Sequence, residues 1–542
     1  MIKNVNKSSA FWQSIQKMLD KKEIICLVLI ILLASFFRLW KLDSIPPGIY
    51  PDEAINANQA LSEPAKIFYP ENNGREGLYI NLVSLSFKIF NPSIWSFKII
   101  SVSAGILTIL GIYLLTKELF QYAENSSRHI ALFSSLFLAT SFWHINFSRI
   151  AFRAILVPLL SCFGFYFLFK GFRKKSPIHL IVSGILFGLG LHTYIAFRMI
   201  VLVLAVIFVF WLIEYYKNKD LKNFFLLSFY YSTSIILAFF PIMMYFIKNP
   251  ADFIGRTQGV SIFNQESPIL AGIKSFVIHL ASFNFIGDGN LRHNISDSPV
   301  LFWPVGILFL IGLAFCIKKI ISWFKSKDYP SLVTYSFLLS WFLVMLLPGV
   351  LTYEGIPHSL RIIGAIPPVF IFAGLGASII YQFIKKKISF EKKSLNHYLI
   401  LLSAFLLLFS FIFSQYARYF EIWAKNPETQ GAFSKGLVDI GEYLNSLPEQ
   451  TQKYVVVNMP GVHVKNIPMP AQTPMFIESL KFGKLRAEYI LPENIDQVKI
   501  KQGNNIIVLM QYEQQLMDKL FKMFPNGESI QDKEIWIFQI NN

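Results

Sequence analysis

Two adjacent carboxylates, Asp52 and Glu53, follow the first long apolar run of the chain, which covers residues 24–40. This run is long enough to cross a hydrocarbon core of about 30 Å, and Pro46 and Pro47 then prevent the helix from continuing. The pair is therefore expected just outside one face of a membrane. A carboxylate in that place can accept a proton from a substrate that the membrane delivers.

Arginines, histidines and a tyrosine lie near the ends of other apolar runs. A guanidinium group binds two phosphate oxygens at once, so these arginines suit a phosphate-bearing substrate. The candidate phosphate ligands are Arg75, Arg149, Arg153, Arg198, Arg292 and Arg361. The candidate substrate-binding residues are His144, His192, Tyr194, His293 and His358. Transfer of a sugar from a lipid phosphate to a hydroxyl needs a base for the acceptor proton and cations for the departing phosphate.

Each of these residues also has a structural explanation. We predict that Asp52 is the general base and that Glu53 orients it, binds the acceptor or holds local structure. Asp52 is equally suited to cap the helix that the sequence predicts after it. Arg149 and Arg153 are four residues apart, a spacing that would put both on one helical face to bind one phosphate, although arginines at this level also contact lipid headgroups. The histidines are equally suited to the membrane interface.

The candidate residues do not have the spacing of a metal site. The stretch from Asp288 to Asn294 contains a histidine but no recognisable ligand pattern, so no metal ligand is predicted and a divalent-metal requirement stays open. The three cysteines, Cys26, Cys162 and Cys316, all lie in apolar runs and are expected to be small buried side chains.

The elements that position these residues are mostly membrane spans, because 54% of the 542 residues are hydrophobic and only 15% are charged. The eleven predicted spans are 24–40, 97–116, 129–146, 154–171, 178–193, 198–215, 224–247, 300–317, 331–352, 362–383 and 397–414. Residues 77–90 are apolar too, but a helix of this length extends only about 21 Å, so we expect it to lie on the membrane surface.

Loop charge gives the orientation. With residues 77–90 left out of the count, the basic N-terminus and the basic loops at 173–175, 217–222, 318–327 and 385–387 all share one side, as cytoplasmic loops do. Asp52 and the C-terminal region then face outward, and we predict a multi-pass protein of the plasma (inner) membrane. The net charge of +17 is explained by these loops, so nucleic acid is not an expected partner.

Residues 415–542 have a different composition, with charges of both signs between short apolar blocks. The patterns predict strands at 453–458, 505–510 and 534–540 and helices at 433–446 and 511–524. The fold class is therefore mainly α, with a transmembrane domain over residues 1–414 and a small extracytoplasmic α/β domain over residues 415–542.

The chain resembles the GT-C glycosyltransferases, in particular the family of the protein O-mannosyltransferases and the aminoarabinose lipid A transferases. The resemblance covers about residues 1–414 and is carried by Pro51-Asp52-Glu53-Ala54, by Arg75-Glu76-Gly77-Leu78-Tyr79 and by the general character of residues 148–158. It implies a GT-C arrangement of the spans, a polyprenyl-phosphate sugar donor, transfer with inversion, and Asp52 as the base. Many relatives carry a second acid in the next outer loop, whereas residues 144–160 contain none. This departure leaves the sugar, the acceptor and the retained activity open.

The favoured function is an integral-membrane glycosyltransferase that moves a sugar to a hydroxyl or amine of an envelope glycan, lipid or protein. One alternative is a transporter or flippase for a lipid-linked glycan. That class is expected to place ionisable residues near the membrane centre and often to have related halves, whereas the charged residues of this chain lie at span ends and no repeat is evident. The other alternative is an inactive GT-C scaffold whose outer domain recruits partners.

Overall fold

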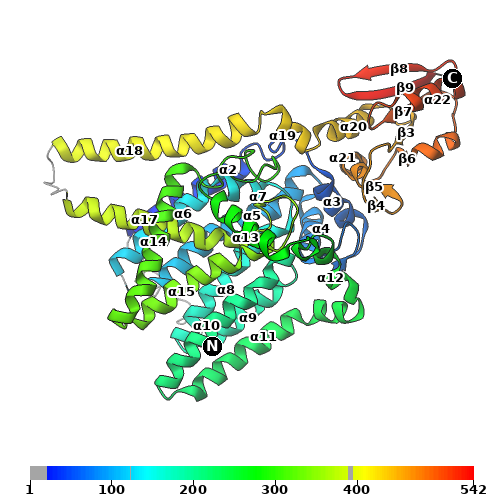
Figure 1. Ribbon diagram of the computed structural model, residues 1–542. Coiled ribbons are helices and arrows are strands. Elements are labelled where there is room, and N and C mark those ends of the chain that lie inside the picture. The colour runs from blue at the N-terminus through cyan, green and yellow to red at the C-terminus, as the bar shows by residue number, and fades with distance from the viewer. Residues whose placement is uncertain (1–20, 123, 388–394, 542) are drawn as a thin grey trace, which may run out of the picture.

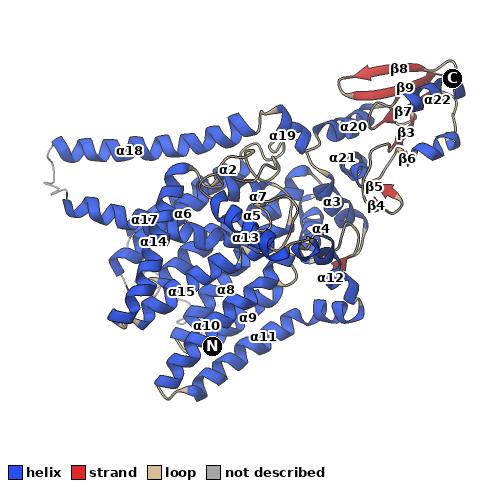
Figure 2. Ribbon diagram, in the orientation of Figure 1, coloured by secondary structure: helices blue, strands red, loops and turns tan. Residues whose placement is uncertain are grey.

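The structure is a computed structural model that describes residues 21–122, 124–387 and 395–541 (Figure 1). The basic N-terminus predicted to be cytoplasmic lies outside these residues. Helices make up most of the fold, and the main sheet lies at one end of the molecule (Figure 2). The long apolar helices are α2 (Lys21–Leu39), α5 (Ile94–Leu119), α6 (Glu124–Thr140), α8 (Leu156–Arg173), α9 (Pro177–Gly190), α10 (Ile200–Lys217), α11 (Leu221–Lys248), α14 (Trp303–Ser326), α15 (Tyr329–Val344), α17 (Ile366–Lys387) and α18 (Leu395–Tyr416).

Each of the eleven predicted spans falls largely on one of these helices. Among the described residues, eight helices are long and apolar enough to cross a membrane, or nine if the bent pair α6 and α7 (Phe142–Arg149) forms one span. The predicted number is therefore approximate, because α9 has only 14 residues and α2 carries four charged residues near its ends. The segment predicted to lie on the membrane surface is α4 (Leu78–Phe90), a helix of 13 residues.

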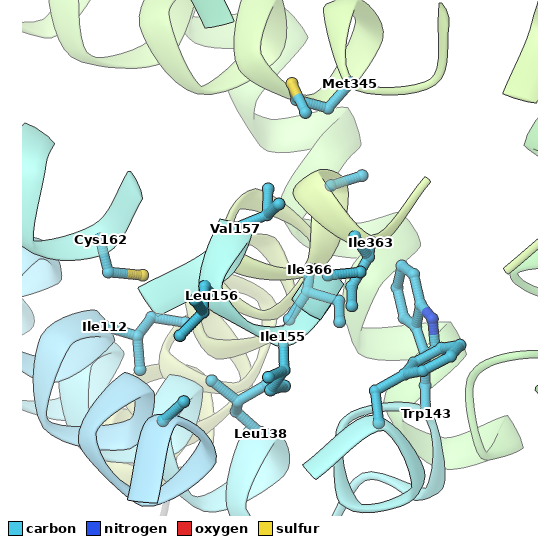
Figure 3. Close-up of a cluster of buried hydrophobic side chains, with 14 of the residues drawn as sticks. Ile112, Leu138, Trp143, Ile155, Leu156, Val157, Cys162, Met345, Ile363 and Ile366 are labelled. Atoms are coloured by element: carbon cyan, nitrogen blue, oxygen red, sulfur yellow. The ribbon is translucent and has the colours of Figure 1, made fainter. Parts of the chain in front are cut away.

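Glycines let the spans pack backbone against backbone. A Cβ on Gly376 of α17 would lie 2.0 Å from the Leu308 carbonyl oxygen of α14, and a Cβ on Gly184 of α9 would lie 2.5 Å from the Tyr231 carbonyl oxygen of α11. Between the helices, branched and aromatic side chains such as Ile155 and Trp143 fill the core (Figure 3). The spans therefore form a tightly packed scaffold for the loops at their ends.

The loops predicted to be cytoplasmic gather at one end of the bundle. Lys117 bonds to Glu23 at 2.8 Å, Arg173 bonds to Glu118 at 2.5 Å, and Lys175 bonds to Asp220 at 2.5 Å. The predicted outer loops meet at the other end, together with α3 (Pro51–Ser62), the short strands β1 (Phe68–Tyr69) and β2 (Arg75–Glu76), α12 (Pro250–Gly259), α13 (Pro268–Ser282) and α16 (Leu347–Val350). The sequence analysis had predicted neither α12 nor α13.

The C-terminal part forms a five-stranded sheet in the order β6-β3-β7-β9-β8. Its strands are β3 (Gln452–Val456), β6 (Glu488–Ile490), β7 (Asn504–Leu509), β8 (Glu528–Asp532) and β9 (Ile535–Asn541). β3 is parallel to β6 and β7, whereas β9 is antiparallel to β7 and β8. The helices α20 (Lys435–Ser446) and α22 (Gln514–Met523) pack on its two faces, with Leu444 and Leu520 both fully buried. The three predicted strands and two predicted helices therefore coincide with elements of this sheet domain.

This sheet domain contacts the transmembrane part through α21 (Gln472–Phe482), which lies beside α3 (Figure 1). The Thr473 hydroxyl donates to the Ile49 carbonyl oxygen at 2.9 Å, and the Asn58 amide donates to the Gln472 carbonyl oxygen at 2.9 Å. The helix that carries Asp52 is therefore held from both sides, by the bundle and by the C-terminal domain.

Candidate active site

Asp52 is the second residue of α3 and is 41% exposed. The helix begins after Tyr50, which takes the N-cap position, so the alternative that Asp52 caps this helix is wrong. One carboxylate oxygen accepts a hydrogen bond from the Asn72 amide at 2.7 Å, and the other lies 4.0 Å from the Arg292 guanidinium. The carboxylate also lies at the positive end of the helix dipole.

Glu53 points the opposite way and is fully buried. Its Oε2 accepts a hydrogen bond from the Ala151 N–H at 2.8 Å, whereas its Oε1 has no hydrogen-bond partner among the described residues. Burial raises the pKa of this carboxyl to about 7, against the opposing effect of the buried Lys98 ammonium. Of the roles predicted for Glu53, this geometry favours holding local structure, because the carboxyl ties α3 to the segment after α7.

Arg75 lies buried beneath α3. Its guanidinium donates to the Asn56 side chain at 2.6 Å and to the Gln59 side chain, and its Nε donates to the Glu71 carbonyl oxygen at 3.4 Å. Burial lowers the pKa of Arg75 to about 9. These bonds hold the helix that carries Asp52, while a role of Arg75 in phosphate binding stays a prediction.

Arg153 and Arg198 meet on the carboxylate of Glu76. The Nε of Arg153 bonds to Glu76 at 3.0 Å, and Arg198 lies 3.7 Å from the other oxygen of the same carboxylate. Tyr194, one of the candidate substrate-binding residues, is buried with its ring 5.4 Å from the Arg153 guanidinium. Three predicted site residues are therefore neighbours in space, but around an acid that the sequence analysis had not assigned a role.

Arg149 does not share a helical face with Arg153, so that expectation was wrong. Helix α7 ends at Arg149, and Ile150 adopts an extended conformation that separates the two arginines. Arg149 instead donates to the carbonyl oxygens of Phe37 at 2.9 Å and of Trp40 at 2.7 Å, at the end of α2. These carbonyls have no partner within their own helix, which explains why a buried cation is stable there. Lipid headgroup contact is also excluded, because Arg149 and Arg153 are both buried.

His144 and His192 are both buried, away from Asp52's direct contacts. The Nδ1 of His144 accepts a hydrogen bond from Arg38 at 2.8 Å, and its Nε2 has no hydrogen-bond partner among the described residues. The Nε2 of His192 bonds to the Ala238 carbonyl oxygen of α11 at 2.9 Å. Substrate binding by these two histidines stays a prediction.

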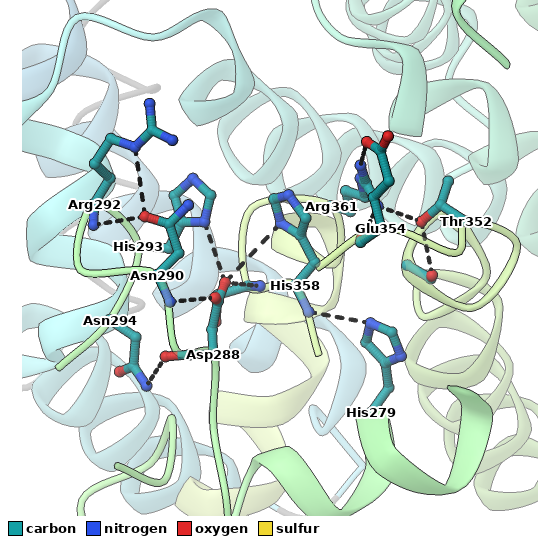
Figure 4. A network of polar contacts seen from close by, with 12 residues as sticks. His279, Asp288, Asn290, Arg292, His293, Asn294, Thr352, Glu354, His358 and Arg361 are labelled. Carbon is teal, nitrogen blue, oxygen red and sulfur yellow. Dashed lines mark hydrogen bonds and ion pairs between the residues drawn. The ribbon is translucent and has the colours of Figure 1, made fainter. Parts of the chain in front are cut away.

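The remaining candidates lie in two loops that meet each other (Figure 4). His293 and His358 face one carboxylate, that of Asp288, and their rings lie 4.8 Å apart. Arg292, next to His293, reaches toward Asp52 and lies over the Tyr50 ring at 5.1 Å. Arg361 is engaged elsewhere in its own loop, where it donates to the Thr352 hydroxyl at 2.6 Å and to the Glu354 carbonyl oxygen at 2.5 Å.

The exposed acid of the site is therefore Asp52, flanked by Asn72 and Arg292 at the beginning of α3.

The chain is similar to known proteins in part of its sequence and in its fold. Residues 78–245 match the family described as dolichyl-phosphate-mannose-protein mannosyltransferase. No curated protein sequence matches the chain.

Solved structures that share the fold include the following two. One is ArnT from Cupriavidus metallidurans bound to undecaprenyl phosphate, with 12% identity and a TM-score of 0.53 over 96% of this chain and 98% of that chain. The chain has the GT-C membrane glycosyltransferase fold. The other is the Archaeoglobus fulgidus oligosaccharyltransferase tethered with an acceptor peptide, with 13% identity and a TM-score of 0.50 over 83% of this chain. This chain covers only 63% of that oligosaccharyltransferase.

The sequence pattern does not reveal several residues around Asp52, Glu53 and the bend between α6 and α7. Asn72 donates to Asp52, Lys98 is buried near Glu53, and Arg38 is fully buried at the bend between α6 and α7. A charged residue inside an apolar run was the one available signal for Arg38 and Lys98. No local pattern marks Asn72 or the approach of Asp288 to two histidines, because each contact depends on the tertiary fold.

Proposed function

We propose that this chain is an integral-membrane glycosyltransferase that moves a sugar from a polyprenyl-phosphate carrier to a hydroxyl or amine of a cell-envelope acceptor. The observation that carries the proposal is the exposed Asp52 carboxylate at the beginning of α3, held by Asn72 and lying 4.0 Å from Arg292. The fold supports it, since ArnT shares this fold and its solved structure holds undecaprenyl phosphate. The acceptor is an envelope glycan, lipid or protein.

In the proposed reaction, Asp52 takes the proton of the acceptor group while that group attacks the anomeric carbon of the sugar. The bond between this carbon and the phosphate oxygen breaks, and the electron pair leaves with the lipid phosphate. Attack from the face opposite the phosphate inverts the anomeric configuration. We assign Arg292, whose guanidinium lies 4.0 Å from Asp52, as the cation that stabilises the charge on the departing phosphate.

Glu53 has a supporting role in this proposal. Its side chain is buried and bonds to the Ala151 N–H, so it cannot share the proton transfer with Asp52 at the surface. It fixes the first turn of α3, and the C-terminal domain fixes the helix from the other side through Asn58. The base is thus held in one position on a rigid element.

The proposed location is the plasma (inner) membrane, with the N-terminus in the cytoplasm and Asp52 and the C-terminal domain outside. The ion-paired basic loops at the opposite end of the bundle support this orientation. A donor carried on a lipid would then reach Asp52 from the outer leaflet.

Envelope analysis of a deletion strain tests the function in the cell. We expect mass spectrometry of the envelope glycans to lose a specific sugar, and a plasmid with the native gene to restore it. Asp52→Asn should not restore the sugar, whereas Asp43→Asn, a change at an exposed acid of the same loop, should. Restoration by Asp52→Asn would contradict the assigned base, and an unchanged envelope in the deletion strain would favour a scaffold. Accumulation of the lipid-linked glycan on the cytoplasmic leaflet would favour the flippase.

A further inference from the structure

Asp288, His293 and His358 present three potential metal ligands to one point in space (Figure 4). The Nδ1 of His293 lies 3.1 Å from the Oδ2 of Asp288, and the Nδ1 of His358 lies 4.0 Å from the same oxygen. The three ligand atoms lie within 4.8 Å of one another. Asp288 and His293 are buried, and His358 is largely so, with 16% of its side chain exposed.

We propose that these three residues bind one divalent transition-metal ion of the zinc type. Two imidazoles and one carboxylate are a common zinc ligand set, which leaves a fourth position for water or substrate. Ligand atoms at about 2.1 Å from a tetrahedral ion lie about 3.4 Å apart, so the widest separation in the cluster, up to 4.8 Å, would close by up to about 1.4 Å when an ion binds. On binding, the ion replaces the proton that the Nδ1 of His293 now shares with the carboxylate.

The groups around the ligands hold them in this orientation. The backbone N–H groups of Ser359 and Asn290 donate to the two oxygens of Asp288, at 2.8 and 2.9 Å. The backbone N–H of His358 donates to the Nε2 of His279 at 3.3 Å. These second contacts fix the carboxylate and one histidine before a metal arrives, which is the usual design of a metal site in proteins.

A groove of about 600 Å³ lies beside the cluster, and its wall includes Asp288. The groove is also lined by Asn290, Asp297 and Pro357 and by apolar side chains such as Phe285. Asp288 therefore lies between this groove and the two histidines, which do not line the groove.

The ion would join two loops that are more than sixty residues apart in the sequence, the loop of Asp288 and His293 and the loop of His358. Arg292 lies between these ligands and Asp52, and its backbone carbonyl oxygen accepts a hydrogen bond from Asn146 at 2.7 Å. The proposal concerns metal binding and does not depend on the proposed glycosyl transfer, so a binding measurement tests it separately.

The test is a titration of the purified, metal-free full-length protein with Co²⁺, which reports tetrahedral coordination through its visible absorption bands. We expect one Co²⁺ per chain, displaced by Zn²⁺, in the native protein and in His463→Ala, which changes an exposed histidine of the C-terminal domain. His293→Ala and His358→Ala should weaken binding by more than about 100-fold, since even outer contacts of a metal-binding histidine change affinity about 10- to 100-fold.

Asp288→Asn provides a variant of nearly unchanged shape in case the alanine variants fail to fold, and size-exclusion chromatography checks each protein. Failure of the native protein to bind Co²⁺ in a tetrahedral site would overturn the proposal. Retention of native affinity by His293→Ala, His358→Ala and Asp288→Asn would overturn it equally, because the ion would then lie elsewhere.

Discussion

Asp52 and Glu53 are neighbours in the chain, but their carboxyl groups lie in opposite environments. Successive side chains of a helix point about 100° apart, so one residue of the pair faces solvent while the other faces the bundle. Asp52 accepts a hydrogen bond from Asn72 and its side chain is 41% exposed, whereas Glu53 is fully buried and one of its oxygens has no hydrogen-bond partner in the described part of the chain. Of the two adjacent carboxylates, only that of Asp52 is open to a substrate, whereas that of Glu53 holds local structure.

The buried carboxyl gives a pH dependence of stability. Burial raises the pKa of Glu53 to about 7, Lys98 and Arg292 oppose the shift, and Asp52 adds to it. The protonated form is favoured in the folded state, so this contribution is fully present below about pH 4.5 and is lost as pH rises through about 7. Relative to Glu53→Gln, the native protein should therefore lose unfolding temperature between about pH 5 and pH 8. Tryptophan fluorescence during heating measures this, and parallel pH curves for the two proteins would exclude the effect.

Arg292 is the cation expected to act on the departing phosphate. Arg292→Ala should lower kcat/KM about 10²-fold, the loss typical of one removed charge-stabilising donor, and Arg292→Lys should recover part of it because a single point charge remains. The control is Arg486→Ala, which removes a guanidinium that bonds to the Pro448 carbonyl oxygen in the C-terminal domain. Equal kinetics of the Arg292 and Arg486 variants would remove Arg292 from the mechanism.

At the scale of elements, the bend between α6 and α7 is the feature that shapes the site. The two helices meet at 57°, and the break leaves backbone carbonyls inside the membrane domain without helical partners. Arg38 of α2 is a hydrogen-bond donor to these carbonyls. It donates to the Ala139 carbonyl oxygen at 2.9 Å and to the Leu138 carbonyl oxygen at 3.4 Å. One buried cation therefore permits the turn that brings α7 and Arg149 against the end of α2.

Loss of Arg38 should destabilise the fold through this bend. Arg38→Ala removes the side-chain donor to the buried Ala139 carbonyl oxygen and to the buried Nδ1 of His144. Each such group costs about 1–3 kcal/mol, so we expect a loss of at least about 2 kcal/mol in the free energy of unfolding. Ser35→Ala on the same helix removes one hydroxyl that bonds within its own helix, and should change stability by much less. Denaturant unfolding in detergent compares the two variants. Similar stability of both would mean that the bend does not depend on Arg38.

On the scale of the whole molecule, the two ends of the helix bundle carry different charged residues and different domains. Ion-paired basic loops gather at one end, and Asp52, the metal-ligand cluster and the C-terminal domain gather at the other. If loop charge sets the orientation, the second end faces outward.

Cysteine labelling tests that orientation in a Cys26→Ser background. Cys26 was expected to be buried but is exposed on the surface of α2, whereas Cys162 and Cys316 are buried, so this change removes the exposed native thiol. A membrane-impermeant maleimide on intact cells should label Val462→Cys in the C-terminal domain, which is 51% exposed. It should label Tyr122→Cys, at the opposite end and 72% exposed, only after the cells are opened. The reverse pattern would place Asp52 in the cytoplasm and exclude the proposed reaction.

The sequence predicts the spans of this fold well, because long apolar runs have few alternatives in a membrane. It also places Asp52 at the end of a span. It fails where a side chain meets a distant partner: Arg149 bonds to carbonyls more than a hundred residues away, and Arg153 bonds to Glu76. Such contacts leave no periodicity in the sequence. The partners of the arginines and the cluster around Asp288 therefore could not be predicted without the tertiary fold.

The most direct test of the account is sugar transfer by the purified protein in lipid vesicles, with polyprenyl-phosphate sugars extracted from its host as donors. The native protein and Asp43→Asn should transfer at equal rates, and Asp52→Asn should be slower by about 10²- to 10⁴-fold, the usual contribution of a positioned base. Transfer by Asp52→Asn at the native rate would contradict the central claim that Asp52 removes the acceptor proton.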